Sequence, residues 1–283
     1  MLNKDLKILI VGLGLLGGSY AKKLTSEGYR VRAITRDPDT IKYALEHNMI
    51  ESGTVEIDKD LIADSDLIIF ALYPKVFIKW IEEHGHLIKA GTVITDVTGV
   101  KGSVVDKVQS ALPEGIEFIS AHPMAGRESS GIEYADDTIF KCANYIVVPT
   151  EKNTPEGILL CRELGKTLGF AKVSELSVEE HDRMIAFLSQ LTHCIAVSLM
   201  CTDDNPDLIK YTGDSFRDLT RIANINDEMW SELFLLNRDA LLHEMDRFKA
   251  SFDELYDTVK NNKRDEMRAL MRTSSERRRK FNK

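Results

Sequence analysis

Cysteine is scarce in this sequence, and that scarcity excludes two classes of protein. Four cysteines, Cys142, Cys161, Cys194 and Cys201, are spread over 283 residues, and none of them belongs to a Cys-x-x-Cys pair. Disulfide-dense secreted domains and thiolate zinc sites need cysteines at closer, paired spacings. We therefore expect reduced, buried thiols, no disulfide framework and no metal site.

A positive charge excess and long apolar runs are also missing. The chain has 37 Lys and Arg residues against 45 Asp and Glu residues, a net charge of -8, so it offers no basic field for a nucleic-acid backbone. No apolar run approaches the roughly 20 residues that a membrane span needs, and residues 1–7 lack the apolar core of a signal peptide. These absences predict a cytoplasmic protein without nucleic-acid or membrane partners.

Proline and glycine almost vanish in the second half of the chain. After Ser177 there are only Pro206 and Gly213, and apolar residues recur at helical spacing. A length of 283 residues also exceeds what one hydrophobic core usually supports. We predict two domains, residues 1–176 and an all-helical unit over residues 177–283.

The helical unit carries two broad apolar faces, over Phe187 to Cys201 and Trp230 to Leu242. One thin layer of helices cannot bury both faces by itself. We therefore expect a homodimer built on this half of the chain.

Short runs rich in Val, Ile and Leu alternate with amphipathic stretches in the first domain, as in an open parallel sheet covered by helices on both faces. The predicted strands are Lys7 to Val11, Val31 to Thr35, Leu67 to Leu72, Thr92 to Val97, Glu117 to Ala121, Asn144 to Pro149 and Ala171 to Leu176. Helices are predicted between them, for example over Asp39 to Asn48 and Pro155 to Leu168. The fold class of this domain is α/β.

A glycine-rich turn, Gly12-Leu-Gly14-Leu-Leu-Gly17, connects the first predicted strand to a helix. Its glycines allow a tight turn, close approach of a pyrophosphate and close helix packing, with the phosphates at the helix N-terminus. This context predicts a Rossmann-type dinucleotide-binding domain; the alternative is a glycine-rich turn without a ligand. The predicted cofactor contacts are Gly12, Gly14, Leu15, Leu16 and Gly17 in the loop, and Leu72 and Thr98 at the ends of later strands.

The end of the second predicted strand bears on the choice between NAD and NADP. An acid at this place hydrogen-bonds a ribose 2′-hydroxyl and repels a 2′-phosphate. Here Thr35 and Arg36 suit a phosphate, which favours NADP. Asp37 follows directly and can turn toward the ribose, so NAD stays open.

Three polar segments stand out against this background: Thr95 to Lys101, Ser120 to Gly126 and Phe216 to Ala223. The first two end predicted strands, and ligands of parallel sheets bind outside the carboxyl ends of strands. Thr98 and His122 are therefore expected to face the nicotinamide end of the cleft. The third segment lies in the helical half.

Together these segments resemble the prephenate/arogenate dehydrogenase family of tyrosine biosynthesis. The likeness spans almost the whole chain and rests on the glycine loop, His-Pro-Met-Ala-Gly at 122–126, Ser189 with His193, Phe-Arg-Asp-Leu-Thr-Arg-Ile-Ala at 216–223 and Met229-Trp230. The resemblance implies oxidative decarboxylation of a small molecule, prephenate or arogenate, with hydride transfer to NAD(P), and a homodimer. The sequence does not separate the two substrates.

The resemblance also implies roles for single residues. His122 would take the proton of the ring hydroxyl as hydride departs, a task that suits imidazole because its pKa lies close to neutral pH. Arg221 would bind a substrate carboxylate with its planar guanidinium. Ser189, His193 and Trp230 would line the substrate pocket.

One position departs from the family pattern. Many members carry a serine that helps to hold the substrate hydroxyl where this chain has Gly99, so either Thr98 supplies that hydroxyl or the contact is absent. Arg127, just after the histidine box, is a candidate for a second carboxylate ligand; a surface salt bridge is the alternative.

Two other functions remain open at this point. A β-hydroxyacid dehydrogenase or an imine reductase also pairs a dinucleotide domain with a helical one, although the hydroxyacid enzymes depend on a lysine and an asparagine where this chain offers Ser189 and His193. A catalytically idle dinucleotide sensor is the second alternative, and turnover would exclude it.

Overall fold

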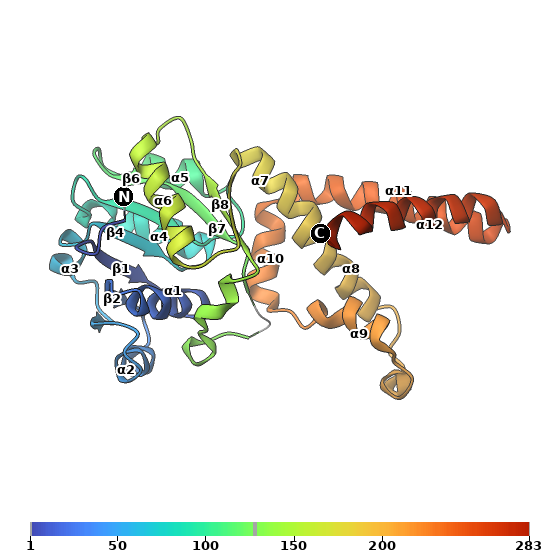
Figure 1. The fold of residues 1–283 in the computed structure, drawn as a ribbon, viewed down its shortest axis with the longest axis horizontal. Helices are drawn as coiled ribbons and strands as arrows, with labels where there is room; N and C mark the ends of the chain where they lie inside the picture. Colours follow the sequence, from blue (N-terminus) through green and yellow to red (C-terminus); the bar gives the residue numbers. More distant parts are fainter. Residues whose placement is uncertain (1, 127–128, 283) are drawn as a thin grey trace.

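The first half of the chain folds around a parallel β-sheet in the computed structural model, which describes residues 2–126 and 129–282 (Figure 1). In spatial order its strands are β3 (Ser52–Thr54), β2 (Arg30–Ile34), β1 (Lys7–Val11), β4 (Leu67–Phe70), β5 (Val93–Asp96) and β6 (Glu117–Phe118). This 3-2-1-4-5-6 order is that of the Rossmann fold and confirms the predicted α/β class. The carboxyl ends of these strands lie at one edge, where the ligands of parallel sheets bind.

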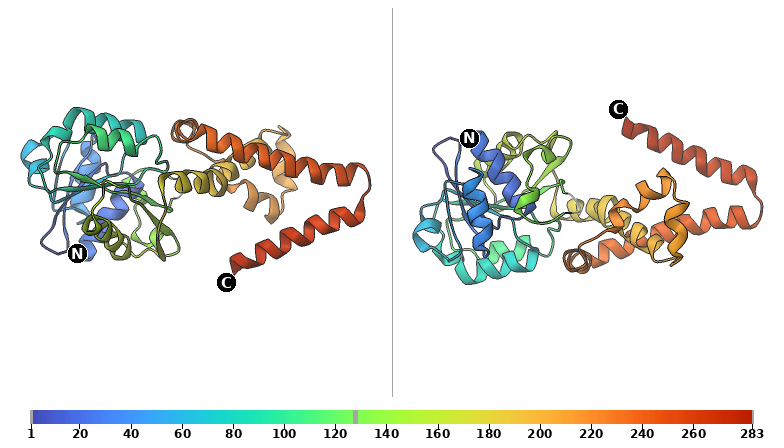
Figure 2. Two further views of the ribbon diagram at one scale, coloured as in Figure 1. Left: turned by 90° about the horizontal axis from the view of Figure 1, so that it is seen from above. Right: turned by 90° about the horizontal axis from the view of Figure 1, so that it is seen from below.

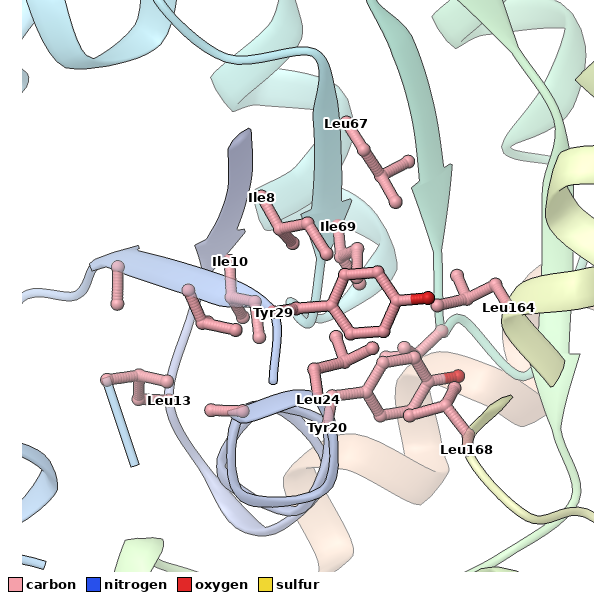
Figure 3. Packing of buried hydrophobic residues seen from close by; sticks show 14 of the residues in the cluster. Ile8, Ile10, Leu13, Tyr20, Leu24, Tyr29, Leu67, Ile69, Leu164 and Leu168 are labelled. Atoms are coloured by element: carbon pink, nitrogen blue, oxygen red, sulfur yellow. The ribbon is translucent and has the colours of Figure 1, made fainter. Parts of the chain in front are cut away.

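The sheet is covered on both faces because its strands are apolar on both faces. In β1, Ile8 and Ile10 join one hydrophobic cluster, whereas Leu9 and Val11 join another on the opposite face. Figure 3 shows the first cluster, in which Tyr20 of helix α1 packs below the strands. The flanking helices are α1 (Leu15–Ser26), α2 (Pro38–Glu46), α3 (Lys59–Ala63), α4 (Pro74–His84), α5 (Val105–Ala111) and α6 (Pro155–Thr167).

The last part of the α/β half differs from the sequence prediction. The single strand predicted over Glu117 to Ala121 divides into β6 and β7 (Ser120–Pro123), and β7 pairs antiparallel with β8 (Asn144–Val148). With β9 (Lys172–Glu175), these strands form a second, three-stranded sheet, so the expectation of one parallel sheet was wrong here. Alternation of apolar residues identifies strands, but it does not specify their partners or direction.

The other predicted strands and helices agree with the structure to within about two residues at each end. The edge strand β3 was missed because its sequence, Ser-Gly-Thr, is short and polar.

The second half is helical, as predicted, and starts at Ser177, which forms a capping box with Glu180. Its elements are α7 (Val178–Ile185), the π-helical turn η4 (Ala186–Gln190), α8 (Leu191–Met200), η5 (Pro206–Lys210), α9 (Asp214–Thr220), η6 (Arg221–Ala223), α10 (Asp227–Leu236), α11 (Arg238–Lys260), α12 (Arg264–Arg279) and η7 (Lys280–Asn282). Helix α10 lies against the α/β half (Figure 1). Its residues Leu233 and Leu236 pack on the hydrophobic core of that half. The α11–α12 hairpin projects away from it (Figure 2).

Much apolar surface stays exposed in the helical half. Phe187 and Leu242, from the two predicted apolar faces, are 51% and 50% exposed. The helical stretch Val178–Met200 is long and apolar enough to span a membrane by length and composition, with a mean hydropathy of 1.3 in its most apolar 18-residue window. It carries the buried groups His181 and Asp182 against the α/β half, which a lipid-facing span would not do.

The thiols are only partly as expected. All four cysteines are free, and Cys161 is buried, but Cys142 and Cys201 are exposed and Cys194 is half-buried. The expectation of buried thiols was therefore wrong for Cys142 and Cys201, which lie in a turn and at the end of an exposed helix, respectively.

Candidate active site

The glycine turn after β1 forms a cradle in which positions 12 and 17 accept only glycine. Gly12 has φ +95, and a Cβ on Gly17 would lie 2.0 Å from the carbonyl oxygen of Gly12. Beside Gly14 nothing lies within 4 Å of an added Cβ, so the loop is open there, just before the first turn of α1. Free backbone N–H groups of a helix N-terminus next to open space suit a pyrophosphate, and these residues therefore fit a dinucleotide.

Three further predicted cofactor contacts lie beside this cradle. Leu15 and Leu16 begin α1 and are half-buried. Leu72, just after β4, lies so close to Gly12 that its Cδ2 would be 2.9 Å from an added Cβ. The structure thus brings these leucines to the edge of the sheet where β1 and β4 end.

At the end of β2, Asp37 and Arg36 have different surroundings. One carboxylate oxygen of Asp37 accepts a hydrogen bond from the Asp39 N–H at 3.1 Å, and the other accepts one from the Thr40 hydroxyl at 2.6 Å. These bonds, Thr40 first, lower the pKa of Asp37. Arg36 is exposed, and its guanidinium makes no hydrogen bond or ion pair with any residue that the structure describes.

His122 lies on β7 and begins a chain of hydrogen bonds that runs into the helical half. Its Nδ1 is 2.9 Å from Nε2 of His181, and Nδ1 of His181 is 2.7 Å from Oδ1 of Asp182. Burial, then the neighbouring His181 and Lys101, holds the pKa of His122 well below 6.5. His122 is therefore neutral at neutral pH, as a proton acceptor must be.

The segment from Asp96 to Lys101 is fixed by a fully buried ion pair. Lys101 Nζ donates to Asp96 Oδ2 at 2.8 Å and to the Ala121 carbonyl at 2.7 Å, beside His122. The hydroxyl of Thr98 donates to Asp96 and accepts from Lys101 at 3.2 Å. Thr98 is buried, and its hydroxyl is already engaged within this network.

Gly99 stands next to Nε2 of His122, the ring nitrogen for which the described residues provide no hydrogen bond. An added Cβ at Gly99 would be 3.8 Å from Nε2 of His122 and 3.6 Å from Leu233 of α10. Nε2 therefore points toward the place where the loop after β5, which contains Gly99 and is called the Gly99 loop below, meets α10. No side chain of residue 99 occupies that place.

The residues predicted for the substrate pocket in the helical half come together around α8 and α10. The rings of His193 and Trp230 are 3.7 Å apart at 30°, and Nδ1 of His193 lies 2.9 Å from the Ser189 carbonyl oxygen. Arg221 begins η6, which packs against α8. Arg127 lies outside the described residues.

The sequence analysis assigned no role to four members of the His122 network. Asp96 and Lys101 lie in the segment Thr95 to Lys101 that it singled out, whereas it did not single out His181 and Asp182. His181 and Ile185 are both buried on one face of α7, four residues apart, so a polar residue at a core position was the available signal. Without the fold, nothing in the sequence connects that position to His122.

Comparison with known proteins decides the family. Residues 20–173 match the profile of the prephenate dehydrogenase nucleotide-binding domain, and residues 177–273 match that of the prephenate dehydrogenase dimerization domain. The chain belongs to the prephenate dehydrogenase family. The prephenate dehydrogenase of Bacillus subtilis (strain 168) is 30% identical over 256 residues, which are 88% of this chain and 68% of that protein.

Two solved structures have the same overall fold. Prephenate dehydrogenase from Aquifex aeolicus in complex with hydroxyphenyl propionate and NAD+ superposes with a TM-score of 0.90 at 27% identity, covering 99% of each chain. Synechocystis arogenate dehydrogenase superposes with a TM-score of 0.83 at 25% identity, covering 98% of this chain and 100% of that one. The chain is thus an NAD(P)-dependent dehydrogenase of this family, and the family match favours this activity over the hydroxyacid dehydrogenase alternative.

Proposed function

We propose that the enzyme converts prephenate to 4-hydroxyphenylpyruvate, with His122 as the base. The observation that carries the proposal is the orientation of His122, whose Nδ1 is engaged by His181 while Nε2 faces the Gly99 loop and α10. A bound nicotinamide supplies the hydride acceptor. Nε2 takes the proton of the ring hydroxyl as hydride leaves the carbinol carbon. Departure of the ring carboxylate as carbon dioxide then leaves an aromatic phenolate, to which Nε2 returns the proton.

Other residues of this chain hold the substrate in the proposed reaction. Arg221 pairs with a substrate carboxylate, and the stacked His193 and Trp230 contact the ring, with Ser189 behind His193. The hydroxyphenyl propionate bound by the Aquifex enzyme has the phenol and the three-carbon acid that the proposed product also has. Because Thr98 is engaged with Asp96 and Lys101, we assign it to shaping the loop rather than to the substrate hydroxyl.

The experiment that tests this function compares steady-state rates with prephenate and with arogenate. We expect kcat/KM to be higher for prephenate. A higher value for arogenate would move the enzyme to the other activity of its family, with which the Synechocystis neighbour is compatible. No turnover of either substrate would contradict the proposal.

We further propose that the enzyme prefers NADP. Both carboxylate oxygens of Asp37 are used to cap α2, whereas Arg36 is exposed at the same strand end without a partner among the described residues. Arg36→Ala is expected to raise KM for NADP about tenfold, or roughly 1.4 kcal/mol, and to leave KM for NAD nearly unchanged. Arg30→Ala removes an exposed arginine from the other end of β2 and is the control. Equal KM values for NADP in the two variants would contradict this preference.

We also propose that the enzyme is a homodimer located in the cytoplasm. The helical half matches the dimerization domain of its family, and its apolar faces are half-exposed in the single chain. Light scattering at micromolar concentration should give about twice the chain mass of 32.0 kDa. A monomeric mass would contradict the dimer.

A further inference from the structure

We propose that His181 and Asp182 are positioning residues for His122: they determine which nitrogen of His122 carries a proton and which one accepts the proton of the substrate. The proposal rests on the proposed role of His122 as the base. It concerns residues of α7, in the helical half, that act on a residue of β7 in the α/β half.

In the series of hydrogen bonds that joins His122, His181 and Asp182, the charge of Asp182 determines which atom donates in each bond. Its Oδ1 accepts the N–H of Lys101 at 2.9 Å, and its Oδ2 accepts the N–H of Gly102 at 2.7 Å. Burial opposes ionisation of Asp182, but the bonds from His181 and from these two backbone groups lower its pKa below 3.8. Asp182 is therefore a carboxylate and only accepts hydrogen bonds.

The tautomers of the two imidazoles follow in turn. Nδ1 of His181 faces Oδ1 of Asp182 at 2.7 Å and must donate to it, so in the neutral ring Nε2 of His181 is an acceptor. His122 presents Nδ1 to that acceptor at 2.9 Å and must in turn donate. This leaves Nε2 of His122 with its lone pair toward Gly99 and α10, where a substrate hydroxyl can give up its proton.

The charges around the two rings act in opposite directions: Lys101 lowers the pKa of both imidazoles, whereas Asp182 and Asp96 raise that of His181. The groups that face them are the carboxylates of Asp96 and Asp182 and the ammonium of Lys101. Lys101 and Asp96 form an ion pair with each other, so the negative charge of Asp182 has no cation of its own among these groups. A proton accepted by His122 gives the pair of imidazoles one positive charge, which the carboxylate of Asp182 balances through His181.

The Asp182 end of the hydrogen-bond chain is held firmly, as it must be if Asp182 is to orient the two imidazole rings. Asn237 Nδ2 donates to the Asp182 carbonyl at 2.9 Å and to Oε1 of Gln190 at 2.8 Å, which ties α7 to the end of α10. His181 is completely buried, so its ring has no water to replace the contact with His122.

The first test reads the tautomer directly. In wild-type enzyme with 15N-labelled histidine, long-range 1H–15N spectra near neutral pH should show His122 protonated at Nδ1 and unprotonated at Nε2. The His122→Asn spectrum identifies the signals by their loss. His122 protonated at Nε2 in the resting enzyme would overturn the proposal, and this measurement needs no substitution of His181.

The second test compares two substitutions at His181. Gln at this position can still accept from His122 Nδ1 through its carbonyl oxygen but cannot take a proton, whereas Leu offers no acceptor. We expect His181→Leu to lower kcat on the order of 100-fold with a small change in KM, and His181→Gln to recover activity to within about tenfold of wild type. His47→Leu, at the exposed end of α2, is the matched control. Equal losses in folded His181→Leu and His181→Gln would overturn the proposal.

The two tests separate this proposal from the proposed function. If the spectra show the expected tautomer but His122→Asn turns over normally, His122 is not the base, although His181 and Asp182 still orient it. If His122→Asn is inactive but His122 is protonated at Nε2, the function stands and the positioning role is excluded.

Discussion

Lys101→Met is expected to lower the free energy of unfolding of the α/β half by about 3 to 5 kcal/mol. Lys101 and Asp96 are both fully buried, and the ammonium also satisfies the Ala121 carbonyl at 2.7 Å. The substitution leaves the four other hydrogen bonds to Asp96, from Thr98, Ser120 and Ala121, but removes the cation that forms an ion pair with it. An uncompensated buried charge costs far more than a lost surface contact.

The control for this prediction is the same substitution in an exposed pair. Lys89 and Asp66 lie 3.2 Å apart with side chains 42% and 37% exposed, so Lys89→Met should cost no more than about 1 kcal/mol. Urea unfolding followed by Trp80, which is buried in α4, reports on the α/β half if both variants are made in a Trp230→Phe background. Similar losses in the two variants would mean that the buried pair contributes little more than an exposed one.

The local chemistry of the α/β half was predictable from sequence because it depends on neighbours in the chain. Gly12 needs a positive φ and Gly17 packs against the Gly12 carbonyl, and a glycine loop between an apolar strand and a helix indicates that arrangement. The doubly buried strand β1 likewise follows from a run without polar alternation. The residues that carry each of these signals lie within about 20 positions of one another in the sequence.

The His122 network was not predictable in the same way, since its contacts join distant segments. His122 and His181 are separated by 59 positions, and Asp182 reaches Lys101 across 81. His181 alone in a sequence looks like any histidine near the start of a helix. The ring of His181 reaches His122 only because α7 packs on the loop that contains Gly99. The pairing of β7 with β8 presents His122 to the ring of His181.

His122→Asn is expected to lower turnover by about 10²- to 10⁴-fold while KM for the substrate changes by a small factor. Asparagine can hydrogen-bond the substrate hydroxyl but cannot take its proton. Because burial and the neighbours His181 and Lys101 lower the pKa of His122, its neutral form persists below pH 6.5. The acid limb of kcat/KM in wild type should therefore have its midpoint below that pH, with activity falling as His122 becomes protonated, and this limb should disappear in the variant.

The competing interpretation is that His122 only shapes the turn before Pro123, at the end of β7. In that case His122→Asn would weaken cofactor binding or folding and would leave the chemical step intact. Single-turnover rates across pH, with circular dichroism to confirm the fold and a separate titration of NADP, distinguish the two roles. A folded His122→Asn enzyme that keeps near-normal single-turnover rates and the wild-type acid limb would exclude His122 as the base. Loss of the rate and of the acid limb together, with NADP affinity unchanged, is the result expected if His122 takes the proton.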